Sequence, residues 1–152
     1  MATLHLMVGL PCSGKTTRAK ILEKEYHALT LTPDKWQIRL FGNDTMEEDH
    51  DLRHNTIEGI MWELAERLLT LGTNVILDFG FWGKEERVYF KNKAKELGAD
   101  FKIHFMDLPE DELYKRLEER NDELPDGVFT IPKEEMEKYI KLFQPPDKEE
   151  LL

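Results

Sequence analysis

The sequence predicts an α/β fold in which a mostly parallel sheet of four or five strands is covered by helices on both faces. Short apolar segments suited to buried strands alternate with longer segments of helical periodicity, which is typical of a parallel sheet with helical crossovers. A glycine-rich turn joins the first apolar segment to the first helical one. We find no internal repeat, low-complexity segment or linker, so residues 1–152 are expected to form one domain.

Four elements are expected in the first part of the chain, because apolar runs end at turn residues and helical runs lack glycine and proline in their interior. They are a strand at residues 3–8, a helix at 15–26, a strand at 28–32 and a helix at 33–41. Gly9 ends the first strand, and Gly42 ends the second helix. Pro33 and Asp34 suit the first helical turn, because proline fixes φ and a carboxylate favours a helix N-terminus.

The later elements follow from the same reasoning. Apolar residues at three- and four-residue spacing predict a long helix that ends before Gly72; they are Ile57, Ile60, Met61, Leu64, Leu68 and Leu71. After it we expect a strand at residues 74–82, a helix at 84–97, a strand at 100–108, a helix from Pro109 to about Arg120 and a helix at 133–143. Residues 121–132 are expected to form a loop, and residues 144–152 a tail.

The composition is that of a well-solvated globular domain, with 40% hydrophobic and 34% charged residues. The net charge of −10 disfavours nucleic acid as a bulk partner but leaves room for a local basic cleft. The lone cysteine, Cys12, predicts no internal disulfide and a reducing compartment, the cytoplasm. No apolar run reaches the roughly 18 residues of a membrane span, so no membrane partner is expected. The oligomeric state does not follow from the sequence.

Residues 9–16 read GLPCSGKT and match the Walker A or P-loop pattern G-x-x-x-x-G-K-[ST] between an expected strand and helix. Glycines let successive N–H groups turn inward onto phosphate oxygens, and the helix N-terminus adds partial positive charge. The lysine neutralises the β- and γ-phosphates, and the next hydroxyl suits Mg²⁺. The sequence therefore predicts an ATP site with Mg²⁺, formed by Gly9, Pro11, Cys12, Ser13, Gly14, Lys15, Thr16 and Thr17.

Asp78 closes the apolar run at residues 75–77 and is the expected second metal residue beside Thr16. An acidic residue at this point of such a fold lies next to the nucleotide and steadies Mg²⁺. The tripeptide Asp-Phe-Gly at 78–80 also resembles the metal-binding signature of protein kinases, but their H-R-D loop is missing. The N-K-x-D motif of GTP-binding switches is missing as well. A turn-forming or helix-capping aspartate is the alternative.

Asp34 follows the second expected strand, so it should emerge at the same edge of a parallel sheet as the glycine loop. A carboxylate there can accept the proton of an attacking hydroxyl and hold it in line with the γ-phosphate. We therefore expect Asp34 to be the catalytic base. The alternative is that Pro33 and Asp34 only begin a helix.

Four segments together resemble the small P-loop kinases that include the polynucleotide 5′-kinase domain of phage, the zeta-toxin kinases and chloramphenicol phosphotransferase. They are GLPCSGKTT, LTPDKW, VILDFGFWGKEER and FMDLPEDELYKRLEER, and the likeness covers residues 1–120. The resemblance implies a P-loop NTPase fold, AAA-type ATP binding, a catalytic Asp34 and a small helical lid at about residues 109–131. It also implies that Arg120 contacts nucleotide phosphate, with Arg116 one turn earlier.

The residues themselves support this lid in part, since Arg116 and Arg120 are four positions apart and share a helix face. Glu112 and Glu119 lie nearby, so a salt-bridged surface helix is the alternative. One position departs from the polynucleotide kinases, in which the resemblance places an arginine three residues after the aspartate; this chain has Gln37 there. A polyanionic acceptor is therefore disfavoured.

Other residues keep more than one interpretation. His50 and His54 share an expected helix face, so they are a metal pair, part of a solvated acidic face, or a wall of the acceptor pocket. Arg87 is a candidate phosphate or acceptor contact, and residues 143–146 are a candidate cover for the adenine. Four aromatic residues are either core or pocket floor: Trp36, Phe79, Phe81 and Trp82.

These patterns predict an ATP-dependent phosphotransferase that transfers the γ-phosphate to a hydroxyl of a small-molecule acceptor. Its expected catalytic residues are Asp34, Lys15, Arg120 and Arg116. A polynucleotide 5′-hydroxyl kinase is the alternative among enzymes, and a nucleotide-binding switch with slow ATP hydrolysis is the alternative from another class. The identity of the acceptor does not follow from residue spacing.

Overall fold

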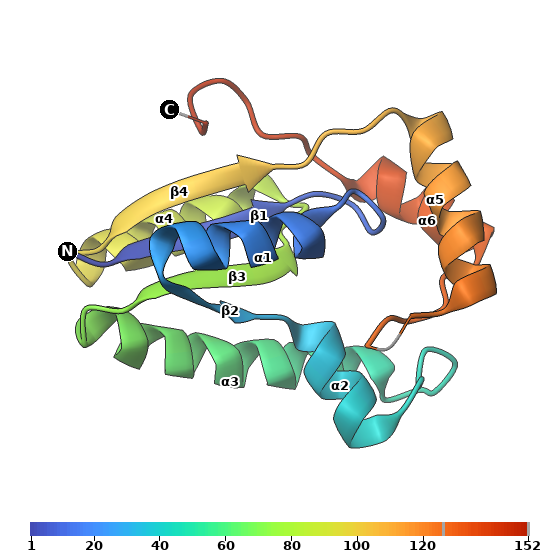
Figure 1. The fold of residues 1–152 in the computed structure, drawn as a ribbon, viewed down its shortest axis with the longest axis horizontal. Helices are drawn as coiled ribbons and strands as arrows, with labels where there is room; N and C mark the ends of the chain where they lie inside the picture. The colour runs from blue at the N-terminus through green and yellow to red at the C-terminus, as the bar shows by residue number, and fades with distance from the viewer. Residues whose placement is uncertain (126, 152) are drawn as a thin grey trace.

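A computed structural model describes residues 1–125 and 127–151 of the chain and has an α/β architecture (Figure 1). In chain order its elements are β1 (Thr3–Val8), α1 (Lys15–Tyr26), β2 (Ala28–Leu31), α2 (Pro33–Phe41), α3 (His50–Thr70), β3 (Asn74–Gly80), α4 (Lys84–Glu96), β4 (Asp100–Phe105), α5 (Glu110–Glu123) and α6 (Lys133–Leu142). The predicted lid and tail each include one residue, 126 and 152, that lies outside the described residues. None of the helices in the described part combines the length and the apolar character that a membrane crossing needs.

The four strands form one sheet in the order β2-β3-β1-β4. β1 pairs with β3 and β4, and β2 pairs with β3, each in parallel. The predicted parallel sheet is therefore confirmed, with the lower of the two expected strand numbers. Because all strands run the same way, the segments that follow β1, β2 and β3 emerge at one edge of the sheet.

Helices cover both faces of the sheet, as predicted (Figure 1). On one face α1 packs through Ala19 and Leu22 against Met7, Ala28 and Ile76. On the other face α3 and α4 contribute to a larger apolar cluster on the sheet; its helical members are Ile57, Met61, Ala65, Leu69, Phe90 and Ala94. Burial of these side chains fixes the positions of the three helices relative to the strands.

The remaining helices, α2, α5 and α6, gather beyond the carboxyl ends of the strands (Figure 1). A small cluster joins α5 to α6, with Leu117, Ile131 and Met136 buried and Cys12 of the glycine loop packed against them. The Asn121 side chain donates to the Ile131 carbonyl at 2.8 Å and accepts from its N–H at 3.1 Å. These contacts attach the expected lid to the glycine loop.

Three predicted boundaries differ from the structure by two residues or more. β3 ends at Gly80 instead of residue 82, because Gly80 and Phe81 have φ of 93° and 46°, which break the extended conformation. β4 ends at Phe105 instead of residue 108, because its partner β1 ends at Val8, opposite Phe105. α5 continues to Glu123 rather than ending at about residue 120.

Two histidines lie in contact under α1. His5 of β1 is fully buried, and its Nδ1 lies 2.9 Å from Nε2 of His104 in β4. Tyr26 covers the pair, with its ring centroid 4.6 Å from that of His5. Burial, and then the charge of Lys102, lowers the pKa of His5 to about 4, and burial with the neighbouring His5 lowers the pKa of His104 to about 4.

Candidate active site

A cavity of about 1210 Å³ opens at the carboxyl edge of the sheet. Its walls come from the glycine loop, the start of α2, the first half of α3, the β3–α4 turn, α5 and residues 127–132. Most of the predicted site residues line it: Pro11, Cys12, Gly14, Lys15, Thr16, Thr17, Asp34, Asp78, Arg116 and Arg120. Gly9 and Ser13 are buried within the loop itself.

The glycine residues of the loop allow backbone conformations that other residues rarely adopt. Gly14 adopts a φ of 92°, and Cys12 adopts a φ of 70°, which is uncommon for a residue with a side chain. A Cβ on Gly9 would lie 2.6 Å from the Ser13 Oγ and 3.1 Å from the Met106 carbonyl oxygen, so only glycine fits there. The Gly9 N–H donates to the Gly80 carbonyl at 3.0 Å, which ties the loop to the end of β3.

Asp78 lies at the centre of the polar contacts behind the loop. Its buried carboxylate accepts hydrogen bonds from the Thr16 hydroxyl at 2.8 Å and from the Thr32 hydroxyl at 3.2 Å. The Lys15 ammonium lies 3.7 Å from the other carboxylate oxygen. These partners come from α1 and from the segment after β2, and they are not the nearby backbone N–H groups that a turn or a helix cap would use.

Two buried polar atoms around this loop make no hydrogen bond among the described residues. They are the Ser13 hydroxyl and the Asp78 Oδ1. A buried polar atom without a partner carries a desolvation cost that a ligand or ion can relieve. A hydroxyl and a carboxylate oxygen are also ligands that Mg²⁺ prefers. Thr16 and Asp78 therefore fit Mg²⁺, and the loop fits the phosphates it would accompany.

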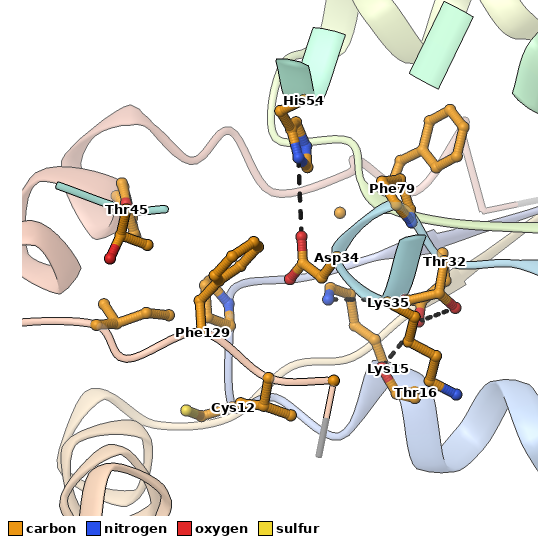
Figure 2. Close-up of a pocket in the computed structure, with 18 of the residues that line it drawn as sticks. Cys12, Lys15, Thr16, Thr32, Asp34, Lys35, Thr45, His54, Phe79 and Phe129 are labelled. Atoms are coloured by element: carbon orange, nitrogen blue, oxygen red, sulfur yellow. Dashed lines mark hydrogen bonds and ion pairs between the residues drawn. The ribbon is translucent and has the colours of Figure 1, made fainter. Parts of the chain in front are cut away.

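Asp34 stands on the opposite side of the cavity from α5, in the first turn of α2. Its side chain is 43% exposed, and its Oδ1 lies 3.8 Å from the His54 Nδ1 of α3 (Figure 2). Because Pro33 begins α2 directly after β2, the carboxylate lies at the carboxyl edge beside the glycine loop, as expected. A carboxylate at this place can accept a proton from a hydroxyl group bound between α2 and the loop.

The two arginines of α5 have different surroundings. The Arg120 Nη1 donates to the Cys12 Sγ at 3.7 Å, and its Nη2 donates to the Phe129 carbonyl at 2.8 Å. Its buried Nε has no hydrogen-bond partner in the part of the chain described. The Arg116 Nη1 lies 3.6 Å from the point where a Cβ on Gly14 would be, while its Nε donates to Glu112 at 3.3 Å. Both guanidinium groups thus face the loop, although Arg116 also forms the alternative surface salt bridge.

Gln37 turns out to be fully buried in a polar network rather than facing the cavity. Its amide nitrogen donates to both oxygens of Asp44 at 3.1–3.2 Å and to the His50 carbonyl at 2.9 Å. Asp44 is also buried; burial raises its pKa, but hydrogen bonds from His50, Gln37 and Arg53 outweigh this and lower the pKa to about 2. Asp44 was not among the residues singled out from the sequence, and it lies in the irregular segment before α3.

His50 and His54 both line the cavity, as a wall of an acceptor pocket would require. The His50 Nδ1 lies 2.7 Å from the Asp44 carboxylate, and the His54 Nδ1 lies 3.1 Å from the Gln37 Oε1. The two rings are stacked with centroids 6.3 Å apart. In the described residues no group of three or more His, Cys, Asp or Glu side chains is arranged to hold a metal ion.

Two carboxyl groups of the cavity were missed by sequence reasoning. Glu58 lies one turn after His54 on α3, and its Oε2 is 3.6 Å from the His54 Nε2. Burial, with the charges of Glu86 and Asp34, raises the pKa of Glu58 to about 8. Burial also raises the pKa of Glu86, which the charge of Arg87 partly opposes. The four-residue spacing from His54 is the signal that would have found Glu58.

The structure does not support the candidate role of Arg87 as a phosphate or acceptor contact. Its buried guanidinium donates to the Phe81 carbonyl at 2.9 Å and to both oxygens of Glu150 in the tail. Residues 143–146 also contact the β3–α4 turn and the sheet. The Gln144 N–H donates to the Trp82 carbonyl at 2.8 Å, and Phe143 stacks on Phe105. The tail therefore fixes the β3–α4 turn.

Of the four aromatic candidates, three line the cavity: Phe79, Phe81 and Trp82.

Three solved structures are similar to this chain. A chain in the structure of the Pnkp1/Rnl/Hen1 RNA repair complex is 28% identical with a TM-score of 0.76 and aligns with 93% of this chain, which spans 43% of its length. Kti12 from Chaetomium thermophilum, in complex with ADP-AlF3, is 20% identical with a TM-score of 0.74, covering 95% of this chain and 81% of Kti12. A sugar kinase from Janibacter sp. HTCC2649 is 14% identical with a TM-score of 0.69, covering 99% and 82%.

The last two likenesses concern the fold, which is that of P-loop kinases. A search among curated proteins finds no match. The family model described as AAA domain matches residues 4–146, nearly the whole chain. The match includes the glycine loop, the parallel sheet and all walls of the cavity. The chain therefore belongs to the AAA domain family and has a P-loop kinase fold.

Proposed function

We propose that this chain is an ATP- and Mg²⁺-dependent kinase that transfers the γ-phosphate to a hydroxyl group of a small molecule. One observation carries the proposal: the Asp34 carboxylate opens onto the same cavity as Lys15 of the loop and Arg120 of α5. The proposal treats residues 1–152 as one kinase-like domain, with residues 109–131 as its lid. The sugar kinase among the similar structures and the ADP-AlF3 held by Kti12 are consistent with it.

The nucleotide side binds by charge and by backbone donors. The loop N–H groups and Lys15 hold the β- and γ-phosphates, while Arg116 and Arg120 approach from α5. Thr16 and Asp78 would hold Mg²⁺, which when bound neutralises charge between the phosphates. Closure of α5 onto the loop would exclude water, so that the phosphoryl group reaches the acceptor instead of hydrolysing.

The transfer step then needs a base on the acceptor side. The acceptor oxygen forms a bond to the γ-phosphorus while the bond from that phosphorus to the bridging oxygen breaks, and ADP leaves with the electron pair. The hydroxyl proton passes to the Asp34 carboxylate and from there to solvent. Asp34 has the exposure that such an exchange requires, since its side chain is 43% exposed.

A polynucleotide 5′-hydroxyl kinase is the second candidate, because the 28% identity is to a chain of an RNA repair complex. The buried position of Gln37 speaks against it, since no cation occupies the place that the polynucleotide kinases give to arginine. A nucleotide-binding switch is the candidate from another class. A switch transfers no phosphoryl group to an acceptor, so its function would not require a base in the cavity.

The test is phosphoryl transfer from labelled ATP by Asp34→Asn, using a mixed panel of hydroxyl acceptors and mass detection. We expect transfer to fall by about 10²–10⁴-fold, the usual contribution of a general base. ATP affinity should stay unchanged in calorimetry. Asp111→Asn, at an exposed position in the first turn of α5, is the matched control. A slow hydrolysis rate that Asp34→Asn leaves untouched would instead support the switch.

A further inference from the structure

The part of the cavity wall formed by α2, α3 and α4 consists mainly of groups that hydrogen bond, with Lys35 of α2 as its cation. Asp34 of α2, His54 and Glu58 of α3, and Glu86 of α4 all line the cavity. Among the lining cations, Lys15, Arg116 and Arg120 belong to the glycine loop or to α5, Lys20 belongs to α1, and Lys35 belongs to α2. The acceptor must therefore bind against carboxyl and imidazole groups.

The buried network fixes the orientation of His54. Because the Gln37 amide nitrogen is directed to Asp44 and to the His50 carbonyl, its Oε1 faces His54 and can only accept a hydrogen bond. The His54 Nδ1 therefore carries the proton, and its Nε2 presents a lone pair toward Glu58. Burial lowers the pKa of His54, with Asp34 opposing and His50 adding to the shift, which keeps the ring neutral near pH 7.

Glu58 complements this lone pair. With a pKa of about 8, its carboxyl group holds a proton at neutral pH and can both donate and accept. Its neighbours are His54 on its own helix, Asp34 from α2 and Glu86 from α4. A hydroxyl placed between the His54 Nε2 and the Glu58 carboxyl would satisfy both groups, since a hydroxyl also donates and accepts.

The same wall disfavours a phosphate. The Arg53 guanidinium of α3 is directed away, toward Asp44 at 3.1 Å and Glu47 at 3.5 Å, and it lies over the Phe41 ring. The Lys35 side chain extends toward Gly127, whose Cβ would lie 3.2 Å from the Lys35 Cγ. A phosphate bound at His54 and Glu58 would thus face the Asp34 carboxylate, and two like charges brought together repel each other.

We propose that His54 and Glu58 form an acceptor subsite for a second hydroxyl, so that the acceptor is a small unphosphorylated polyol. The Asp44–Gln37 network acts as a positioning device that presents the His54 Nε2 to this hydroxyl. This inference rests on the proposed kinase function and sharpens its substrate class.

The experiment compares wild type, Glu58→Gln and His54→Gln in transfer from labelled ATP. The acceptors are a library of sugar alcohols and monosaccharides, the phosphate monoesters of the same compounds, and a 5′-hydroxyl oligonucleotide. Glu63→Gln, on an exposed part of α3 outside the cavity, is the matched control, and thermal melting checks that each variant folds. We expect label on unphosphorylated polyols, a rise of about tenfold or more in acceptor KM for both subsite variants, and no change in ATP KM.

Removal of the second hydroxyl from the best acceptor should have the same effect on the wild type as Glu58→Gln, and the two changes should not add. Transfer to polyols with acceptor KM values that neither variant alters would overturn the inference and leave the proposed function standing. So would label on the phosphate monoesters or on the oligonucleotide with none on the parent polyols. Binding of ATP without transfer to any acceptor would overturn both proposals.

Discussion

The two sides of the cavity are built in opposite ways. The phosphate side consists mainly of one contiguous segment, the glycine loop with Lys15 and Thr16, and it presents backbone donors and cations. The acceptor side is assembled from α2, α3 and α4 and presents carboxyl groups and a neutral imidazole. The first side has the chemistry of anion binding, and the second has the chemistry of hydroxyl binding.

This difference affects how mutations should act. On the phosphate side a residue works directly on a charged ligand, so its loss should appear in nucleotide binding and in transfer. On the acceptor side a residue such as Gln37 works through a buried network, so its loss should appear in stability and in acceptor binding together. Measurements that separate ATP from acceptor therefore test whether the two sides are independent.

On the phosphate side, the largest effect is expected for Lys15→Ala. Loss of a cation that stabilises transferring phosphate costs about 10²–10³-fold in rate, so transfer should fall by this factor, and calorimetry should show weaker ATP binding. Lys24→Ala, in the last turn of α1, is the control. Unchanged ATP affinity in Lys15→Ala would contradict the assignment of this side to the nucleotide.

Away from the phosphate side, the buried His5–His104 pair of the sheet and Glu58 of the acceptor side should make the stability of the fold depend on pH in opposite directions. Below the unfolded value of 6.5 the unfolded chain binds protons at His5 and His104 more readily than the folded chain, in which both have a pKa of about 4. The free energy of unfolding should therefore rise between pH 4 and 6.5, by about 3 kcal/mol for a buried group such as His5. Urea titrations across this range measure the slope.

Glu58 should make the free energy of unfolding fall as pH rises, opposite to the effect of the two histidines. The folded chain keeps its proton up to a pKa of about 8, whereas the unfolded carboxyl loses it near 4.5, so this group stabilises the fold at low pH and ceases to do so as pH rises to 8. Glu58→Gln should remove a contribution that declines between about pH 4.5 and 8, and the double variant His5→Gln, His104→Gln should remove the rise between pH 4 and 6.5 and leave the Glu58 decline. His27→Asn, at an exposed position, is the control for the histidines. If Glu58→Gln left the upper slope in place, Glu58 would not be the group responsible.

The smallest effect is expected for Asp44→Asn. The asparagine side chain keeps one acceptor oxygen but has no negative charge. The charge-assisted hydrogen bonds from His50 and Arg53 are therefore lost, which should cost about 2 kcal/mol in the free energy of unfolding. Acceptor KM should rise because Gln37 no longer holds His54, while ATP KM stays constant. Asp49→Asn, an exposed neighbour, should change neither quantity. A rise in ATP KM equal to that in acceptor KM would mean that the two sides are coupled.

Much of the phosphate side could be predicted from sequence because its geometry is local. Gly9 and Gly14 are needed where the backbone approaches Ser13 and adopts a positive φ, and such needs are visible in residue order alone. The same holds for Asp34, since a residue that follows a parallel strand must lie at the carboxyl edge.

The acceptor side could be predicted only in part. Spacing placed His50 and His54 on one face, but it could not show that Gln37 is buried between them and Asp44. The role of Arg87 was open in the sequence for a related reason: its partner Glu150 lies 63 positions away in the tail. Hydrogen bonds of this kind depend on which elements pack together, and local residue spacing does not predict this packing.

The sequence by itself therefore determined the parallel sheet, the phosphate loop and the edge at which the site lies, because strand periodicity and glycine geometry act over a few residues. Only the tertiary structure decided what faces the loop. Packing of α2, α3 and α4 around the sheet sets the burial of Glu58 and the tautomer of His54, and with them the chemistry that the acceptor meets. Burial and cross-element hydrogen bonds are properties of the folded chain, so no residue order reveals them in advance.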